Sequence, residues 1–314
     1  MRRSRTPAKA GVLLLCAAWL AGCASPQVTQ LVESPPLHLP PRIELERTPF
    51  YPQEDYQCGP AALAAVLAHA GSEVSPEALV GQVYVPGRKG SLQAEMVAAA
   101  RRQGLLAYPL APRLEDALHE VANGTPVVVL QNLSLEWVPI WHYAVLIGYD
   151  IPKREVVLRS GVTRRLTMAM SNFEHTWARS DYWSMVAVPP DRFPATATEE
   201  GYVKAAVALE RVAPAAARRA YGAALERWPK DYVARMGSGN TAYAARDLES
   251  AEREYRRAAT DHPEAPDAWN NLAQALLELG RKSEAAAAAR RAVDLGGPRL
   301  PLYRETLRAI TGTP

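Results

Sequence analysis

Residues 52–67 read PQEDYQCGPAALAAVL, and the rest of the chain can be placed around this stretch. Cys58 stands here between an extended segment and an apolar helix. Gly59 and Pro60 open the helix, because proline suits a first turn whose N–H groups have no intrahelical partner. Those N–H groups and the positive end of the helix dipole point at the sulfur. We therefore expect a lowered thiol pKa and a nucleophile.

Two distant residues have side chains that suit a cysteine nucleophile. Gln53 precedes Cys58 by five positions and offers a side-chain amide that can donate to a developing oxyanion. His142 is the second residue of the apolar segment WHYAVLIGYD (residues 141–150). A cysteine with a histidine far away in the sequence is the pattern of a Cys–His pair. The alternative is a cysteine that acts only as a small, buried hydrophobic residue.

These segments together resemble a known family. Gln53, CGPAAL (residues 58–63) and HYAVLIGYD (residues 142–150) are similar to the bacteriocin-processing, double-glycine-leader cysteine peptidases, and most similar to their stand-alone bacterial lipoprotein relatives. The resemblance covers roughly residues 48–188 and implies a papain-like fold. It also implies that Cys58 is the nucleophile, His142 the general base and Gln53 the oxyanion donor.

The third catalytic member of that family, an Asp after the histidine strand, is missing. The matching stretch VVLRSG (residues 156–161) has Ser160 in its place. If residues 141–149 and 155–161 form a hairpin, His142 faces residues 160–162, whereas Asp150 lies about 25 Å along the strand. The group that orients His142 is therefore Ser160, or Asn132 from the preceding strand, or none.

The N-terminus has the features of a lipoprotein signal. Four basic residues precede an apolar run, and LAGC (residues 20–23) matches a lipoprotein cleavage box. We expect a signal peptide over residues 1–22 and lipid attachment to Cys23. By similarity to such lipoproteins, Ala24 and Ser25 carry no retention signal, so we expect the outer membrane, facing the periplasm. The prolines of residues 23–47 predict an extended tether.

Composition excludes several classes of function. The precursor has 36 Lys and Arg against 33 Asp and Glu, and removal of residues 1–22 takes four of the basic residues, which leaves a net charge near −1. The mature chain therefore lacks the excess of basic residues that would indicate a nucleic-acid partner. The sequence has no metal-ligand spacing and no phosphate-binding glycine loop, so we expect no metal and no cofactor. Cys58 is the one free thiol expected in the mature chain.

Residues 48–190 combine helices in their first half with strands in their second half. This order predicts an α/β (α+β) domain with two lobes, one bringing the nucleophile and the other the base. Strands are expected at residues 126–131, 141–149, 155–159, 164–168 and 183–188. The loop before His142 carries several apolar residues (132–140), and we place part of a substrate cleft there.

A polar linker (residues 191–200) leads into an alanine-rich segment, residues 201–314, with a period of 34 residues. Three sets of positions show this period: Ala217, Ala251 and Ala285; Ala224, Ala258 and Ala292; Tyr221, Tyr255 and Ala289. The pattern resembles tetratricopeptide repeats and predicts an all-α solenoid. Such repeats commonly bind a protein partner, and the alternative here is a structural cap on the peptidase domain.

Three functions remain open at this point. The first is a lipid-anchored cysteine peptidase that hydrolyses peptide bonds in small or leader-type peptides. The second is an inactive peptide-binding or assembly lipoprotein whose repeats recruit a partner. The third is acyl transfer, in which an amine replaces water as the acceptor. The absence of an ATPase motif sets the chain apart from the transporter-fused relatives, so its substrate can differ from theirs.

Overall fold

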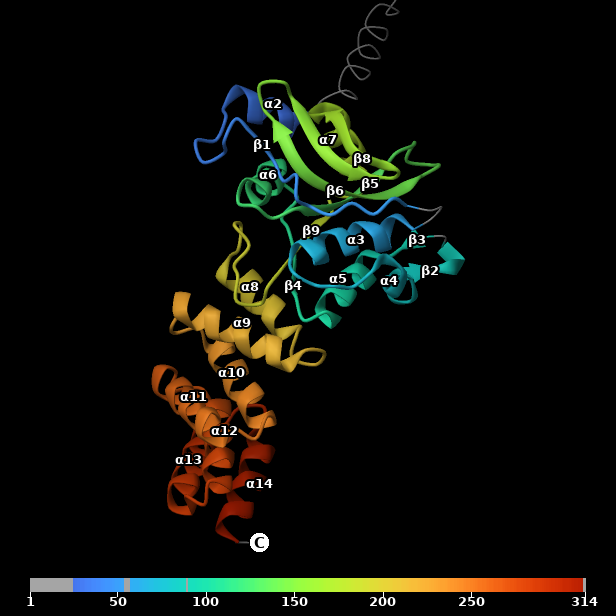
Figure 1. Cartoon of the computed structure of the whole chain (residues 1–314). Helices are drawn as coiled ribbons and strands as arrows, with labels where there is room; N and C mark the ends of the chain where they lie inside the picture. Colours follow the sequence, from blue (N-terminus) through green and yellow to red (C-terminus); the bar gives the residue numbers. More distant parts are fainter. Residues whose placement is uncertain (1–24, 54–56, 89, 313–314) are drawn as a thin grey trace, which may run out of the picture.

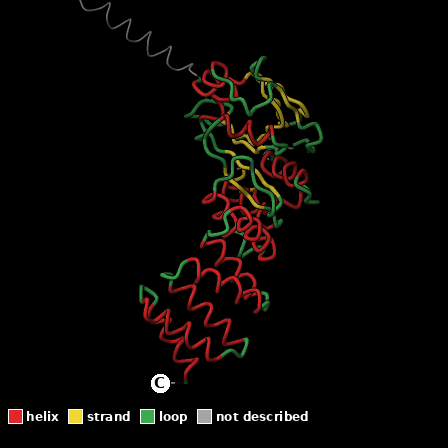
Figure 2. Tube along the Cα trace, turned by 90° about the vertical axis from the view of Figure 1, so that its left-hand side faces the viewer, coloured by secondary structure: helices red, strands yellow, loops and turns green. Residues whose placement is uncertain are grey.

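The computed structural model describes residues 25–53, 57–88 and 90–312 (Figure 1). A domain that contains a sheet lies at one end of the molecule, and a stack of helices extends from it to the C-terminus (Figures 1 and 2). This arrangement confirms the predicted fold class. Within the described residues, no helix is both long and apolar enough to cross a membrane.

The sheet has seven strands and positions the second half of the site. Its strands are β1 (Arg42–Glu44), β4 (Leu106–Pro109), β5 (Val127–Asn132), β6 (Trp141–Asp150), β7 (Glu155–Ser160), β8 (Thr163–Ala169) and β9 (Ser184–Val188). They run in the order β4-β9-β5-β6-β7-β8, with antiparallel pairing throughout, and β1 pairs with the far end of β6. β6 lies inside the sheet between β5 and β7, and residues 143–149 within it are buried.

Helices cover both faces of this sheet. One face packs against α3 (Cys58–His69), α4 (Pro76–Val83) and α5 (Gln93–Arg102), beside the short hairpin β2 (Tyr84–Val85) and β3 (Gly90–Ser91) with its 3-10 turn η1 (Pro86–Arg88). The other face packs against α2 (Pro26–Glu33), α6 (Leu114–Ala122) and α7 (Met170–Ala178). Alternate residues of β5 and β6 contribute to the two cores, as expected for a strand buried on both faces.

The segment expected to be an extended tether is largely folded onto the domain. The carboxylate of Glu174, buried in α7, accepts hydrogen bonds from the backbone N–H groups of Gln27 and Val28 at the start of α2. The side chain of Gln27 in turn bonds the backbone of Pro112 and Leu114. The prediction of a tether over residues 23–47 is therefore wrong for residues 26–44, because partners distant in sequence hold them.

The second part of the molecule consists of paired helices. They are α8 (Glu199–Val207), α9 (Pro214–Arg227), α10 (Tyr232–Ala244), α11 (Leu248–Asp261), α12 (Pro266–Glu278), α13 (Lys282–Leu295) and α14 (Leu300–Thr311). All nine residues of the 34-residue pattern are buried. Tyr221 and Tyr255 pack so closely on Gly237 and Gly239 that a Cβ there would lie under 3 Å from each ring. Small residues thus allow neighbouring helices to approach.

The repeat helices share a core with the sheet-containing domain. Tyr202 of α8 is fully buried and belongs to the same apolar cluster as Leu106 and Tyr108 of β4. Its ring contacts Phe193 and Trp228. The two parts are thus joined by a continuous apolar contact.

Candidate active site

Cys58 is the first residue of α3, as the sequence predicts. Pro60 lies within the first turn, and residues 59–67 are all buried, so the helix is fixed along its length while its N-terminus reaches the edge of the domain. The thiol itself is half-buried. The backbone N–H groups of Tyr143 in β6, of Gly59 and of Cys58 lie near enough to the sulfur to favour its thiolate form. Tyr143 follows His142 directly in β6, so the strand that carries His142 runs beside the N-terminus of α3.

His142 is the second residue of β6, and Ser160 is the last residue of β7. The two strands are antiparallel neighbours, and Nε2 of His142 lies 2.8 Å from Oγ of Ser160. This contact agrees with the hairpin geometry expected from the sequence. The other ring nitrogen, Nδ1, makes no hydrogen bond within residues 25–53, 57–88 and 90–312.

The turn after Ser160 also holds the segment that carries Gln53. The backbone N–H of Gln53 donates to the carbonyl of Gly161, at 3.3 Å. Arg159, buried in β7, donates to the carbonyls of Glu46 and Thr48 in the same segment. One hairpin therefore fixes both the histidine and the segment leading to Gln53.

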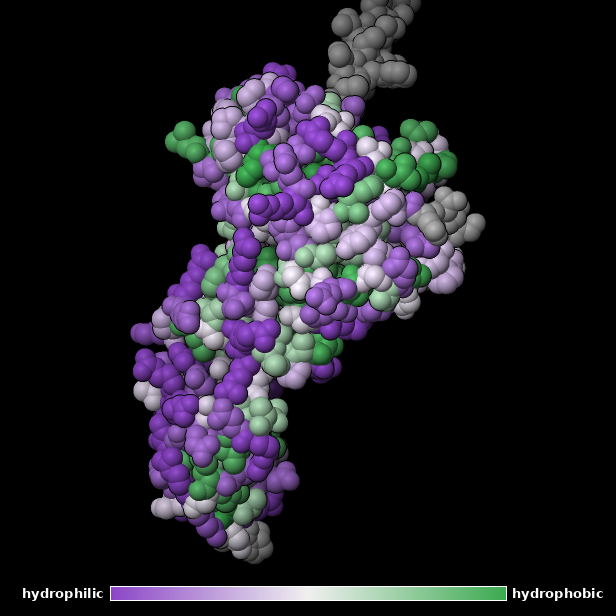
Figure 3. Space-filling model, viewed as in Figure 1, coloured by the Kyte–Doolittle hydropathy of each residue, from purple (hydrophilic) through white to green (hydrophobic). Residues whose placement is uncertain are grey.

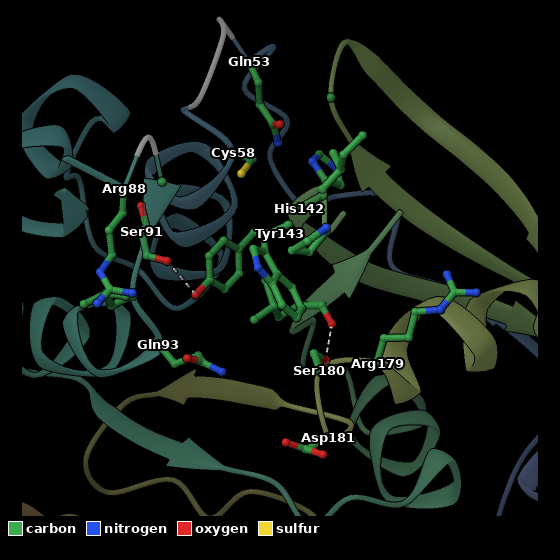
Figure 4. A pocket seen from close by; sticks show the side chains of 17 residues that line it. Gln53, Cys58, Arg88, Ser91, Gln93, His142, Tyr143, Arg179, Ser180 and Asp181 are labelled. Atoms are coloured by element: carbon green, nitrogen blue, oxygen red, sulfur yellow. Dashed lines mark hydrogen bonds between the residues drawn. The ribbon is translucent and has the colours of Figure 1, made fainter. Parts of the chain in front are cut away.

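These residues border one cavity of about 910 Å³ between the helical face and the strands. Its lining consists of Gln53, Cys58, Arg88, Gly90, Ser91, Leu92, Gln93, Leu130, Pro139, Ile140, Trp141, His142, Tyr143, Gly161, Arg179, Ser180 and Asp181. Gln53, Cys58 and His142 gather at one end of it, and Asp181 lies at the other (Figure 4). Ser160 does not line the cavity, but its hydroxyl contacts His142, which does.

The thiol pKa differs from the sequence expectation. Burial raises the pKa of Cys58 above its ordinary value of 9.0, although the backbone hydrogen bonds from Tyr143, Gly59 and Cys58 act in the opposite direction. The helix N-terminus thus contributes as predicted, but loss of solvent outweighs it. Burial also lowers the pKa of His142 below its ordinary value of 6.5. Near pH 7 the site therefore holds a neutral thiol and a neutral imidazole.

The raised pKa of Cys58 predicts a loss of stability at alkaline pH. Above pH 9.0 the thiol of the unfolded chain ionises while the folded thiol keeps its proton, so the free energy of unfolding falls as pH rises. We expect Cys58→Ala to show a smaller fall than wild type between about pH 8 and about pH 10.5. Urea unfolding of both proteins measures the difference, and parallel curves would contradict the expectation.

The other residues considered for orienting His142 lie elsewhere. Oδ1 of Asn132 accepts hydrogen bonds from the backbone of Ser134 and Ile140, so this side chain shapes the loop before β6. Asp150 lies at the opposite end of β6 and bonds Lys153 in the turn to β7. Neither has a recorded contact with His142.

Several residues of the cavity were not singled out from the sequence. Tyr143 donates from its hydroxyl to the carbonyl of Ser91, which ties β6 to β3. Arg179 follows α7 and donates to the carbonyls of Asn132 and Ser134. Asp181 has a φ of 54°, a left-handed conformation that is rare outside glycine. No sequence pattern indicates that conformation, because neither Asp181 nor its neighbours are glycine.

Metal and lipid sites have different outcomes. Among the described residues, no group of three or more His, Cys, Asp and Glu side chains could hold a metal ion. Cys23 and the predicted signal peptide lie outside the described residues. Lipid attachment at Cys23 thus stays a prediction.

Two solved structures are similar to part of this chain. The chain has 20% sequence identity to a C39-like peptidase from Bacillus anthracis, covering 47% of this chain and 97% of that one with a TM-score of 0.40. It has 20% identity to the peptidase domain of Streptococcus ComA, a bifunctional ABC transporter involved in a quorum-sensing pathway, covering 46% and 99% with a TM-score of 0.38. A search of curated proteins found no match.

Family models match two separate parts of the chain. Residues 45–185 match the model of the Peptidase_C39 like family. Residues 238–299 match a tetratricopeptide-repeat model. The chain thus joins a domain like the C39 peptidases to a region of tetratricopeptide repeats.

Proposed function

We propose that this protein is a membrane-anchored cysteine peptidase in which Cys58 and His142 act as a pair. The observation that carries the proposal is that Cys58, His142 and Gln53, from three separate segments, line the same end of one cavity. The contact between Nε2 of His142 and Ser160 leaves Nδ1 to serve as the base.

The first half of the reaction forms a thioester. Nδ1 of His142 takes the thiol proton as Sγ of Cys58 attacks the carbonyl carbon of the scissile peptide bond. The negative charge that develops on the carbonyl oxygen is stabilised by the side-chain amide of Gln53 and the backbone N–H of Cys58. Collapse of this intermediate breaks the C–N bond, and the amine leaves with the proton from His142.

The second half releases the acyl group. His142 removes a proton from a water molecule, which attacks the thioester carbonyl, and the same two donors stabilise the oxyanion. The C–S bond then breaks, the carboxylic acid leaves, and the proton returns to the sulfur. Because both partners are neutral near pH 7, the thiolate forms as the substrate is attacked.

A peptide library tests the proposed activity. The chain from Cys23 onward, with Cys23→Ser to prevent lipid attachment, is incubated with the library, and new N-termini are identified by mass spectrometry. We expect the protein that retains Cys58 to yield cleavage products and the Cys58→Ala variant to yield none. Identical product lists for both proteins would contradict the proposal.

Ser160 is expected to act as a positioning residue. Ser160→Ala removes the hydrogen bond to Nε2 and lets the ring rotate, which we expect to lower kcat/KM by about 10- to 100-fold. Ser160→Asp supplies a carboxylate that raises the pKa of His142, so the acid limb of the pH–rate profile should move to higher pH. An unchanged profile in Ser160→Asp, measured on a peptide from the library, would contradict this role.

A second function, peptide binding without cleavage, is favoured by the raised pKa of Cys58 and the lowered pKa of His142. A neutral, half-buried thiol and a serine in place of the family's Asp also suit a domain that binds a peptide without cleaving it. In that case the wild type and Cys58→Ala bind a library peptide with equal affinity, and neither yields products.

The remaining parts of the proposal concern anchoring and partners. We propose that Cys23 carries lipid and holds the protein at the periplasmic face of the outer membrane, and that the repeats bind a protein partner. The support is the LAGC sequence and the repeat match. Mass spectrometry of the mature N-terminus, with Cys23→Ser as control, tests the lipid.

A further inference from the structure

The loop between β5 and β6 exposes an unusual concentration of apolar side chains. Six large apolar residues of residues 133–141, here called the apolar loop, are exposed: Leu133, Leu135, Trp137, Val138, Ile140 and Trp141. Trp137 is 78% exposed, and Val162 in the neighbouring turn is also 78% exposed. Figure 3 shows apolar surface gathered at the upper right, where Figure 1 places this loop. Large patches of this kind mark interaction sites.

The candidate active site accounts for only part of this loop. Pro139, Ile140 and Trp141 line the cavity, whereas Leu135, Trp137 and Val138 do not. The backbone of Val138 donates to the carbonyl of Leu135, which closes a turn with Trp137 at its tip. The tip thus lies outside the cavity, and its exposed side chains are free to contact something other than a peptide bound there.

The start of the folded chain and the base of this loop are held by the same helix. α7 contacts both: Glu174 holds the backbone of Gln27 and Val28, and Arg179, at the end of the helix, holds the carbonyl of Ser134 at 2.9 Å. Glu174 and Arg179 are five residues apart, or about 7.5 Å along a helix. Figure 1 shows α2 and α7 at the end of the molecule remote from the C-terminus, the end that also carries the loop.

The chain before α2 is too short to separate the domain from an anchor. Cys23 precedes Gln27 by four residues, which span at most about 14 Å when fully extended. A lipid on Cys23 would therefore hold this end of the domain at the bilayer surface. Such a short connection gives the apolar loop a local concentration at the bilayer in the millimolar range, so even weak insertion is populated.

We propose that the apolar loop is a membrane-contact element that inserts Trp137 and its neighbours into the bilayer interface. The proposal rests on anchoring at Cys23 as proposed above. Tryptophan favours the headgroup level, where its ring is partly buried and its N–H stays hydrated. Glu136, the one charged residue in the loop, lies beside Trp137 in the turn and can remain among the headgroups. The cavity with Cys58 then opens beside the membrane.

Fluorescence quenching in vesicles tests this contact. The chain from Cys23 to Pro314 with Cys58→Ala has Cys23 as its only cysteine, which couples to a maleimide lipid in phosphatidylethanolamine–phosphatidylglycerol vesicles. Comparison with the additional variant Trp137→Tyr isolates the emission of Trp137. We expect bromine on the lipid chains to quench about half or more of that emission. The matched variant Trp269→Tyr gives, by the same comparison, the emission of a tryptophan in the repeats, which the brominated lipid should not quench.

The quenching measurement does not depend on the outcome of the peptidase assay. Cys58→Ala lacks the proposed nucleophile, and the maleimide replaces lipid attachment in the cell, so neither activity nor processing affects the measurement. Emission of Trp137 that is unaffected by brominated lipid would overturn the proposal and assign the loop to a protein partner or a second copy. Equal quenching of Trp137 and Trp269 would also overturn it, because it would show no preferred orientation.

Discussion

Replacement of Cys58 by serine is expected to lower kcat/KM for peptide hydrolysis by a factor on the order of 10⁴ or more. A serine hydroxyl is far less acidic than a thiol, and the helix N-terminus and backbone donors around position 58 cannot make up that difference. The site is already at a disadvantage, because burial raises the pKa of the native thiol. The weaker oxygen nucleophile would have to lose its proton in the same partly desolvated place.

The measurement needs proof that the variant is folded. Oxygen is smaller than sulfur, and position 58 is only half-buried, so Cys58→Ser should unfold in urea close to the wild type at pH 7. Binding of an uncleaved library peptide gives a second check that the cavity is intact. A folded Cys58→Ser protein that keeps more than about a tenth of the wild-type rate would rule out the sulfur as nucleophile.

The sheet could be predicted from sequence because its signals are local. The segments that became β5, β6, β7 and β9 are rich in β-branched residues and are bounded by turn residues, and the structure places strands within two residues of each predicted range. The contact between His142 and Ser160 follows from the same local information, since a short turn between adjacent strands determines which residues face each other.

The errors concern information that is distant in the sequence. The prolines of residues 23–47 suggested an extended chain, but residues 26–33 form a helix whose first N–H groups bond Glu174, more than 140 residues away. The thiol pKa was expected to fall, because the helix N-terminus is visible in the sequence and the burial that opposes it is not. The left-handed conformation of Asp181, in the cavity wall, was also missed, since no glycine marks it in the sequence.

A Cys–His pair can work as a preformed ion pair or by proton transfer during attack, and the pKa shifts of Cys58 and His142 bear on which one applies here. An ion pair formed in advance requires a thiol pKa below that of the imidazole, whereas here burial moves the two values apart in the opposite sense. Ser160 contributes a hydrogen bond to His142 but no negative charge that would stabilise an imidazolium. These directions favour, within the proposed mechanism, proton transfer concerted with attack, and we propose that His142 carries it.

Replacement of His142 by alanine tests that conclusion and should have the second large effect. Loss of a general base typically costs 10²- to 10⁴-fold, and we expect a drop in kcat/KM of about 10³-fold near pH 7. The pH dependence should change as well. For the wild type we expect kcat/KM to fall as pH drops through the pKa of His142, which burial lowers below 6.5. In His142→Ala the residual rate should instead rise with pH up to the raised pKa of Cys58.

The control for this variant is a histidine outside the cavity. His119, in α6, packs against His38 and has no recorded contact with the site, so His119→Ala should keep the wild-type rate and profile. Alkylation of Cys58 by iodoacetamide gives an independent readout that requires no substrate. If alkylation and hydrolysis keep the same pH dependence in His142→Ala as in wild type, the imidazole is not the base. The thiol would then have to ionise unaided, which its burial disfavours, and the peptide-binding function would become the better account of the site.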